Sequence, residues 1–269
     1  MSTRTHGPDR VVVVTGAAGG IGRALALMCG ARGDRVALLD LDGGALAQTA
    51  YDVGTAGGEA LAIVCDVTDA DACDAALCKV EDAWGRVDLL VNNAGISHRS
   101  HFAETSDAVL HKVMDVNFFG AVNCTRAALP ALRRSGGAIA VLSSVAGFAP
   151  LVGRTAYAAS KHALHGFFDS LRTELDGEVA VVLVCPSFVN TAIDRHAVNG
   201  DGVQIDRRRP AVGKMLEPED VAAQLLDAVE RRDRQRLVSP VAHLSLWVSR
   251  LAPALYDRIM LRSQSAEFG

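Results

Sequence analysis

The sequence predicts an α/β protein with a doubly wound parallel sheet, and two observations support this prediction. First, apolar runs of strand length alternate at a nearly constant interval with Ala- and Leu-rich stretches suited to helices. Second, most of these runs are continuously apolar, which is typical of strands buried on both faces of a parallel sheet. The expected strands are 11–14, 36–39, 61–65, 87–91, 138–142 and 179–185.

The segments between these strands are expected to form right-handed crossover helices. Repeated alternation of strand and helix predicts a Rossmann-like sheet of about seven strands with helices on both faces. A later helix at about 217–231 and a short strand at 236–239 complete the pattern. The clearest crossover helices are residues 23–29, 70–83, 107–132 and 155–175.

The polarity of the chain changes at its ends and at one internal break. Residues 1–9 are polar and are expected to be flexible, whereas residues 10–240 are expected to form one dinucleotide-binding catalytic domain. The polar stretch at about 190–215 is interpreted as a substrate lid, because a long irregular segment inside a compact domain is usually functional. Residues 241–269 form an apolar tail that we expect to be helical and packed on the same domain.

The composition is that of an ordinary globular protein. Of 269 residues, 49% are hydrophobic and 22% are charged, and the net charge of −4 gives no reason to expect a nucleic-acid partner. The N-terminus has no apolar signal region, which predicts a cytoplasmic protein. The scattered cysteines lack metal-ligand spacing, so we expect reduced core thiols and no metal site. They are Cys29, Cys65, Cys73, Cys78, Cys124 and Cys185.

The apolar tail is interrupted by Pro253 and contains Arg250, Asp257 and Arg258. Charges and a proline within so short a stretch argue against an integral membrane span. Three interpretations remain open: a packed pair of terminal helices, a cover over a substrate channel, or a helix in peripheral contact with a membrane surface.

A glycine-rich turn, Thr15–Gly22, directly follows the first expected strand and opens the first helix. Glycines at positions 16, 20 and 22 let the backbone turn tightly and approach a pyrophosphate, while the helix N-terminus supplies amide donors. This placement predicts a dinucleotide site.

Asp40 ends the second strand, eighteen residues beyond Gly22. A carboxylate there can accept hydrogen bonds from the adenine-ribose hydroxyls and would repel a 2′-phosphate, which favours NAD over NADP. Arg23 and Arg35 are close enough in sequence to restore NADP binding, and Asp40 has an alternative role as a helix N-cap. Asp66, after the third strand, is expected either to meet the adenine edge or to cap the helix near Asp69.

Tyr157 and Lys161 lie four residues apart, with Ser144 thirteen residues upstream of the tyrosine. At this spacing on a helix, the phenol and the ammonium project from the same face. A nearby ammonium favours the tyrosinate and lowers the pKa of a phenol, and a serine hydroxyl can bond the same substrate oxygen. The pattern predicts a proton-transfer site for a carbinol or carbonyl.

The chain resembles the short-chain dehydrogenase/reductase (SDR) family over about residues 10–230. The resemblance rests on ordered motifs: the turn Thr15–Gly22, Asp66-Val67, Asn92-Asn93-Ala94-Gly95, Asn117, Ser143-Ser144, Tyr157-x-x-x-Lys161 and Pro186-x-x-x-x-Thr191.

The resemblance implies that Asn117, Ser144, Tyr157 and Lys161 form a catalytic tetrad. Tyr157 would be the general acid/base, Ser144 would position the substrate oxygen, and Lys161 would lower the pKa of Tyr157 and bind the nicotinamide ribose. Asn117 would hold a water that links Lys161 to a proton relay. Ser143 competes with Ser144, and the spacing to Tyr157 favours Ser144. The residues expected to contact NAD are Gly16, Ala18, Gly20, Ile21, Gly22, Asp40, Asp66, Val67, Asn93, Ala94, Gly95, Tyr157, Lys161, Pro186, Val189 and Thr191.

Two departures from the family pattern carry expectations of their own. Ser187 follows Pro186 where relatives commonly have glycine, so the loop on the nicotinamide side is expected to differ in shape. The C-terminal segment that helps many relatives form tetramers is absent. A homodimer through helices 107–132 and 155–175 is therefore favoured over a homotetramer.

These observations predict hydride transfer between NAD(H) and a secondary alcohol or ketone, with a hydrophobic small-molecule substrate such as a steroid or lipid. An NADPH-dependent carbonyl or 3-ketoacyl reductase and a non-catalytic NAD(H)-sensing regulator are the alternatives. The candidate residues of an apolar pocket are Phe148, Leu151, Val152 and Phe188. Further candidates for substrate contact, each with an alternative as solvated loop or lid surface, are His98, Arg99, His101 and Arg207–Arg209.

Overall fold

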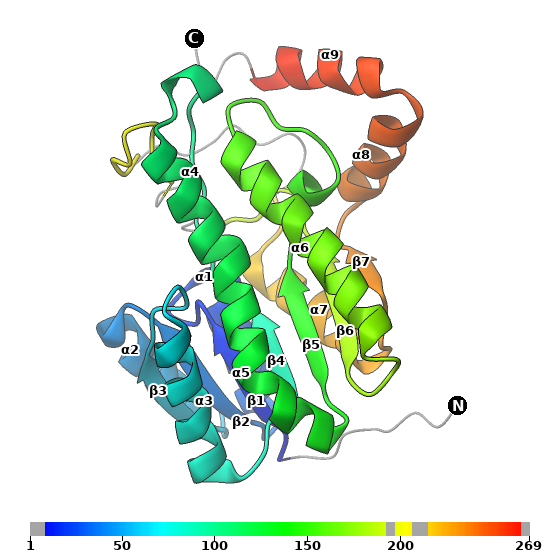
Figure 1. The fold of residues 1–269 in the computed structure, drawn as a ribbon. Coiled ribbons are helices and arrows are strands. Elements are labelled where there is room, and N and C mark those ends of the chain that lie inside the picture. Colours follow the sequence, from blue (N-terminus) through cyan, green and yellow to red (C-terminus); the bar gives the residue numbers. More distant parts are fainter. Residues whose placement is uncertain (1–8, 192–196, 206–214, 265–269) are drawn as a thin grey trace.

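The computed structural model describes residues 9–191, 197–205 and 215–264, and its core is one parallel sheet (Figure 1). The seven strands are arranged in the order β3-β2-β1-β4-β5-β6-β7, with helices on both faces, which confirms the predicted fold class. The strands are β1 Val11–Thr15, β2 Arg35–Asp40, β3 Glu59–Val64, β4 Leu89–Asn92, β5 Ala138–Leu142, β6 Ala180–Cys185 and β7 Gln235–Leu237.

The inner strands are buried on both faces, as their continuous apolar sequences predict. Every residue of β1 and β5 is buried. The chain order reverses where β4 returns to pair with β1 on the side opposite β2. In a doubly wound sheet, such a reversal opens a crevice at the carboxyl ends of the strands, and ligands bind there.

Two layers of helices enclose the sheet. On one face, α3 (Ala70–Trp84), α5 (Gly120–Ser135) and α6 (Thr155–Glu174) share an apolar core with the strands. On the other face, α1 (Gly20–Ala31), α2 (Gly43–Thr55) and α7 (Pro218–Glu230) do the same. Leu90 and Ile139 point into the first core, whereas Leu89 and Ala138 point into the second.

The prediction of a single helix over residues 107–132 is wrong in one respect. The segment consists of α4 (Asp107–Met114), a π-helical turn (Asp115–Phe119) and α5, which extends to Ser135. The wider turn brings Asn117 inward, where its side chain bonds both backbone groups of Ile96. The hydrogen bonds between Asn117 and Ile96 do not affect the spacing of apolar residues. The sequence pattern therefore could not reveal the π-helical turn.

The tail forms two helices, α8 (Pro240–Leu251) and α9 (Pro253–Gln264), which make an elbow at one end of the molecule (Figure 1). Ser239 caps α8 by accepting a hydrogen bond from the Ala242 N–H group at 3.1 Å. Ala242 and Tyr256 pack against Val145 and Ala149. Within the described ranges, no helix has the length and hydropathy needed to cross a membrane.

Only part of the segment interpreted as a lid falls within the described residues, because 192–196 and 206–214 lie outside them. Residues 197–205 lie beside the segment that follows β4. The N–H group of Arg99 donates to the Val198 carbonyl at 2.8 Å, and the N–H group of Val198 donates to the Ser97 carbonyl at 3.0 Å.

Candidate active site

The turn between β1 and α1 is built so that backbone lies against backbone. Gly16 has a φ of +66°, and a Cβ atom there would lie 2.9 Å from the Ala94 Cα atom. At Gly22, a Cβ atom would lie 2.2 Å from the Gly16 carbonyl oxygen. The N-cap residue of α1, Gly19, makes no side-chain capping bond. The first amide groups of α1 therefore face outward without a side chain over them, which fits a dinucleotide pyrophosphate.

A second turn, Asn92–Gly95, is fastened to the glycine-rich turn. The Asn93 side-chain amide donates to the carbonyl oxygens of Thr15 at 2.9 Å and Gly16 at 3.0 Å. The backbone N–H groups of Asn93 and Ala94 both donate to the Thr15 hydroxyl at 3.0 Å. These bonds hold the carboxyl ends of β1 and β4 in one fixed arrangement beside the crevice.

Asp40 is held at the carboxyl end of β2 with its side chain directed toward the glycine-rich turn. Its Oδ2 atom accepts from the Ala18 N–H group at 3.0 Å, and its Oδ1 atom accepts from the Leu41 N–H group at 2.7 Å. The alternative role as a helix cap is wrong, because Asp42 is the N-cap of α2 and accepts from Ala45 at 3.0 Å.

The two arginines that were considered as phosphate ligands are both paired with carboxylates. Arg23 lies 2.6 Å from Asp52, and Arg35 lies 3.3 Å from Glu59. The Arg23 bond lowers the pKa of Asp52 below its usual value. Both guanidinium groups are therefore engaged away from Asp40.

Asp66 and Val67 follow β3. The Asp66 Oδ1 atom accepts from the N–H and the hydroxyl of Thr68, at 2.9 and 2.8 Å. The cap of α3 is Asp69, so Asp66 remains the candidate for the adenine edge. The Val67 side chain is buried against Gly120, and its carbonyl accepts from the Asn123 side-chain amide at 3.1 Å.

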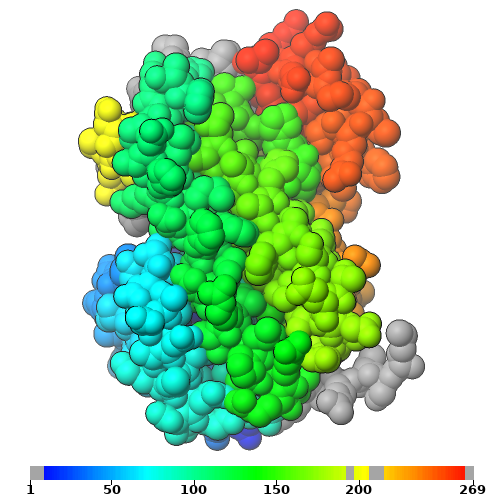
Figure 2. Space-filling model, in the orientation of Figure 1, coloured from blue at the N-terminus to red at the C-terminus, as the bar shows by residue number. Residues whose placement is uncertain are grey.

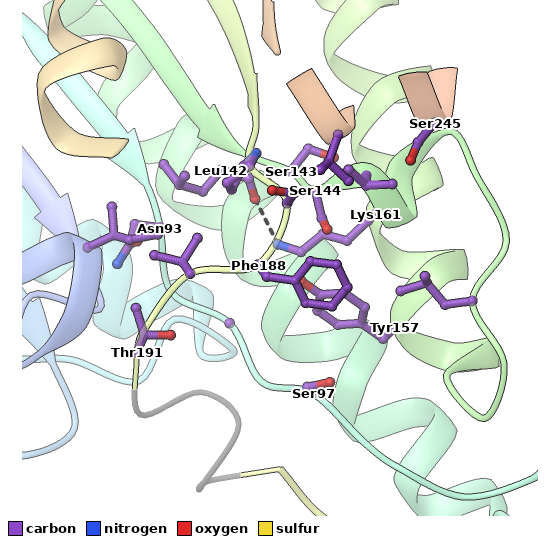
Figure 3. A pocket seen from close by; sticks show the side chains of 18 of the residues that line it. Asn93, Ser97, Leu142, Ser143, Ser144, Tyr157, Lys161, Phe188, Thr191 and Ser245 are labelled. Atoms are coloured by element: carbon purple, nitrogen blue, oxygen red, sulfur yellow. Dashed lines mark hydrogen bonds between the residues drawn. The ribbon is translucent and has the colours of Figure 1, made fainter. Parts of the chain in front are cut away.

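Tyr157 and Lys161 project from successive turns of α6, as their spacing predicts. The Lys161 ammonium lies 5.7 Å from the centroid of the Tyr157 ring and donates to the Leu142 carbonyl at 2.7 Å (Figure 3). Burial lowers the pKa of Lys161 to about 8. The ammonium lies close to the tyrosine, whose ionisation a positive charge favours.

Asn117 is placed behind the tyrosine and the lysine. Its Oδ1 atom accepts from the Ile96 N–H group at 2.8 Å, and its amide donates to the Ile96 carbonyl at 3.0 Å and to the Ser160 hydroxyl at 2.9 Å. Ser160 in turn donates to the Tyr157 carbonyl at 2.8 Å. Asn117 thus ties the π-helical turn to α6, and its role in holding a relay water stays a prediction.

The two serines after β5 have different partners. The Ser143 hydroxyl lies 2.9 Å from His165 Nε2, and burial lowers the pKa of His165 to about 4. The Ser144 hydroxyl accepts from the Ala146 N–H group at 3.2 Å and begins a short helical turn. Because His165 engages Ser143, Ser144 is the serine better placed to bond a substrate oxygen.

One cavity joins the predicted cofactor side to the catalytic side (Figure 3). Ser144, Lys161 and Tyr157 lie between Asn93 and Thr191 on one side and Ser245 on the other. The remaining predicted cofactor residues that line it are Ile21, Gly95, Pro186 and Val189. The predicted cofactor residues that are not among those lining it are Gly16, Ala18, Gly20, Gly22, Asp40, Asp66, Val67 and Ala94.

The far wall of the cavity comes from the C-terminal helices, which the sequence analysis did not assign to the site residue by residue. Val241 and Ser245 of α8 and Tyr256 and Met260 of α9 line it. Burial raises the pKa of Tyr256 above its usual value. The signal available in the sequence was the spacing of four within each pair, which places both members on one helix face.

The departure at Ser187 has a structural counterpart. The Ser239 hydroxyl donates to the Ser187 hydroxyl at 2.8 Å. Because Ser239 is also the N-cap of α8, this bond joins the loop after β6 to the start of the tail. A glycine at position 187 has no hydroxyl group and could not form this hydrogen bond.

The other candidate substrate contacts separate into three groups. Leu151 and Phe188 line the cavity, whereas Phe148 packs beneath α8 and α9, and Val152 is not among the lining residues. His98 and Arg99 are buried, and His101 is exposed. Arg207–Arg209 lie outside the described residues. Ser97, which the sequence analysis missed, also lines the cavity.

Comparison with known proteins agrees with this arrangement. Residues 10–201 match the family model for short chain dehydrogenases. The chain is 34% identical over 266 residues to dehydrogenase/reductase SDR family member 7B of Bos taurus, covering 96% of this chain and 82% of that protein. It is 37% identical over 267 residues to the probable oxidoreductase EphD of Mycobacterium tuberculosis, covering 94% of this chain and 45% of that longer protein.

Solved structures of similar proteins share the fold. A short-chain dehydrogenase/reductase from Burkholderia phymatum in complex with NAD superposes with a TM-score of 0.82 and 28% identity over 92% of this chain and 95% of that one. An alcohol dehydrogenase from Thermococcus sibiricus complexed with 5-hydroxy-NADP gives a TM-score of 0.72 and 26% identity over 85% of this chain and 94% of that one. The chain belongs to the short-chain dehydrogenase/reductase family of oxidoreductases.

Proposed function

We propose that this protein transfers a hydride between NAD(H) and a hydrophobic secondary alcohol or its ketone. The observation that carries the proposal is the single cavity in which Ser144, Tyr157 and Lys161 lie between cofactor-side turns and an apolar wall. A proton-transfer group at the boundary of these two regions is the arrangement that a carbinol beside a nicotinamide needs.

The residues on the cofactor side fit a dinucleotide. Gly16 and Gly22 let the turn pack backbone against backbone, and the uncapped start of α1 offers amide donors to a pyrophosphate. When bound there, the nicotinamide supplies the hydride chemistry. Lys161 would hold its ribose, and Thr191 would contact its carboxamide.

NAD is favoured over NADP on electrostatic grounds. The Asp40 carboxylate is fixed by backbone donors at the end of β2, where it would accept from ribose hydroxyls and repel a 2′-phosphate. Arg23 and Arg35 are occupied by Asp52 and Glu59. A side-by-side titration with NADH and NADPH tests this point, and tighter binding of NADPH would contradict it.

In the oxidative direction, the Tyr157 oxygen would take the hydroxyl proton of the substrate. The nearby Lys161 ammonium stabilises the tyrosinate, and Ser144 would donate a hydrogen bond to the substrate oxygen and hold it in place. In the reductive direction, Tyr157 would return the proton. Acid–base help of this kind contributes about 10²–10⁴-fold to the rate.

The apolar wall supports a hydrophobic substrate. Leu151 and Phe188 face the cavity from the loops, and Val241 and Met260 face it from the tail. Ser245 and Tyr256 add hydroxyl groups at this end, so the wall has polar atoms that can bond a second oxygen of a steroid-like or lipid-like molecule.

The first experiment is NADH formation by purified protein with NAD⁺ or NADP⁺. The panel contains sterols, long-chain and aromatic secondary alcohols, polyols and 3-hydroxyacyl-CoA thioesters. We expect turnover of one hydrophobic class with NAD⁺. Turnover confined to polyols would contradict the hydrophobic substrate, and tight NADH binding without turnover of any alcohol would contradict catalysis.

A further inference from the structure

The helices α8 and α9 carry a concentration of exposed apolar side chains. Among the described residues, six of the twelve large hydrophobic residues that remain exposed fall between positions 244 and 261. Trp247 is 61% exposed and Leu251 is 76% exposed, values typical of polar surface. The other four are Leu244, Leu255, Ile259 and Leu261. A concentration of exposed apolar side chains of this kind marks an interaction surface in a folded protein.

The exposed residues are not needed to hold the helices on the body. Leu244, Trp247 and Leu251 are spaced by three and four residues, so they lie along one outward face of α8. On the inner side of α8, Ala242 packs in the core beneath, and Val241 and Ser245 line the cavity. The helix is therefore apolar on two faces, and only one of them has a partner within the described structure.

The exposed charged residues of the two helices are mainly basic. The residues of α8 and α9 include Arg250, Arg258 and Arg262 against one acidic residue, Asp257, whereas the chain as a whole carries a net charge of −4. Each arginine is next in sequence to an exposed apolar residue. Arginine beside tryptophan and leucine on one helix surface suits the headgroup region of an anionic bilayer.

The helix pair lies at one end of the molecule, where a flat surface can reach it. Figures 1 and 2 show α8 and α9 (orange to red) forming a corner that stands beyond the sheet, with α9 at the outer edge. Each helix has 12 residues, which is too short to cross a hydrocarbon core of about 30 Å. The arrangement that remains for α8 and α9 at a membrane is one in which they lie in the plane of the membrane–water interface.

We propose that the outward face of α8 and α9 docks the protein on an anionic phospholipid bilayer. Trp247 and Leu251, with Leu244 beside them, insert among the lipids, and Arg250 and Arg258 contact the phosphate groups. The inner faces of the same helices line the cavity through Ser245 and Met260. Docking therefore places one wall of the cavity beside the lipid phase, and this last consequence rests on the proposed function.

The test is co-sedimentation of the protein, without added cofactor, with vesicles of phosphatidylcholine alone or of phosphatidylcholine and phosphatidylglycerol. We expect binding to the anionic vesicles, weakened by salt. The double variant Trp247→Ser/Leu251→Ser should bind at least tenfold more weakly, and Arg250→Glu should lose about fivefold or more. The matched control Tyr51→Ser/Phe102→Ser replaces two equally exposed apolar residues elsewhere, at 68% and 67%, and should bind as the unmodified protein does.

Absence of binding to anionic vesicles, or equal binding by the Trp247→Ser/Leu251→Ser variant, would overturn the proposal. So would size-exclusion data in which that variant changes a dimer into a monomer while no vesicle binding occurs, because the face would then join two copies of the chain. Turnover of the same panel of alcohols described above is measured in parallel, without vesicles. Vesicle binding without turnover would overturn only the proposed function, and turnover without vesicle binding would overturn only the docking.

Discussion

The two walls of the cavity are built in different ways. On the cofactor side, Gly16 and Gly22 bring backbone against backbone, and Asn93 fastens β4 to β1 with side-chain hydrogen bonds. On the substrate side, α8 and α9 close the cavity with side chains such as Val241 and Met260. A wall of backbone fixes one ligand shape, whereas a wall of side chains adapts to different ligands by substitution. The cofactor wall should therefore tolerate little change, and the substrate wall should tolerate much more.

The largest effect is expected at Gly22. In Gly22→Ala the new Cβ atom would lie 2.2 Å from a backbone carbonyl oxygen, and neither group can move without distorting the turn. We expect a loss of about 3 kcal/mol in the free energy of unfolding and at least a hundredfold loss of NADH affinity. Denaturant unfolding and fluorescence titration measure these two quantities.

Gly54→Ala is the matched control for this change. Gly54 is exposed within α2, and a Cβ atom there meets nothing within 4 Å. We expect a gain of about 0.5–1 kcal/mol and unchanged NADH binding. Equal behaviour of the two alanine variants would contradict the idea that the cofactor wall is fixed by backbone contact.

Replacement of Lys161 is expected to change stability and turnover in opposite directions. Its pKa of about 8 in the folded protein lies below the value of 10.5 for an exposed lysine, so the unfolded chain binds the proton more tightly. The cost of burying the ammonium is fully present below pH 8 and disappears above about pH 10.5. We expect Lys161→Met to stabilise the fold by up to about 3 kcal/mol at pH 7 while abolishing turnover. Loss of stability in this variant would contradict the claim that the buried ammonium of Lys161 destabilises the fold.

A related effect is expected at His98, which is fully buried and forms a β-bridge with Val198. Burial, with Arg154 nearby, lowers the pKa of His98 to about 4, against 6.5 for an exposed histidine. Between these values the unfolded chain binds more protons than the folded protein. Stability should therefore fall by about 2 kcal/mol as the pH is lowered from 6.5 to 4.5.

Unfolding curves at pH 7.0 and 4.5 measure this loss for three proteins. His98→Leu should reduce the loss, and His101→Leu, at an exposed position, should leave it unchanged. His165 contributes a slope of the same sign, because its pKa is also lowered to about 4, so part of the loss remains in His98→Leu. The same acid slope in all three proteins would contradict a buried neutral His98.

The smallest effect is expected in the substrate wall. Met260→Ala removes apolar surface from the cavity without touching the cofactor turns. We expect KM for a hydrophobic alcohol to rise about tenfold, with NADH affinity unchanged. Leu261→Ala, one residue further and 58% exposed, should leave both quantities unchanged. A loss of NADH affinity in Met260→Ala would show that the two walls are not independent.

The sequence revealed the cofactor wall far better than the substrate wall, for a physical reason. Glycine at positions 16 and 22 and a carboxylate at position 40 are local requirements, and each is visible as a residue type at a fixed distance from a strand. The roles of Tyr256 and Met260 depend on how two helices meet a loop that lies about a hundred residues earlier in the chain. Apolar periodicity shows that such helices have a packed face but not what that face packs against.

Two other features were hidden for the same reason. Within the π-helical turn at Asp115–Phe119, Asn117 bonds Ile96, a contact between distant segments that the spacing of apolar residues does not reveal. The choice between Ser143 and Ser144 follows from His165, which comes from α6 and takes the first serine. The spacing to Tyr157 favoured Ser144. Only the fold shows that His165 is the hydrogen-bond partner of Ser143, which leaves Ser144 for the substrate.

The measurement that tests the central claim most directly is turnover together with NADH binding in Tyr157→Phe, with Ser144→Ala and Ser143→Ala beside it. We predict that Tyr157→Phe abolishes turnover and binds NADH within about threefold of the unmodified protein, because only the proton-transfer group is removed. Ser144→Ala should lose at least about a hundredfold in turnover, and Ser143→Ala only a few-fold. Retained turnover in Tyr157→Phe, or a larger loss in Ser143→Ala than in Ser144→Ala, would contradict the account.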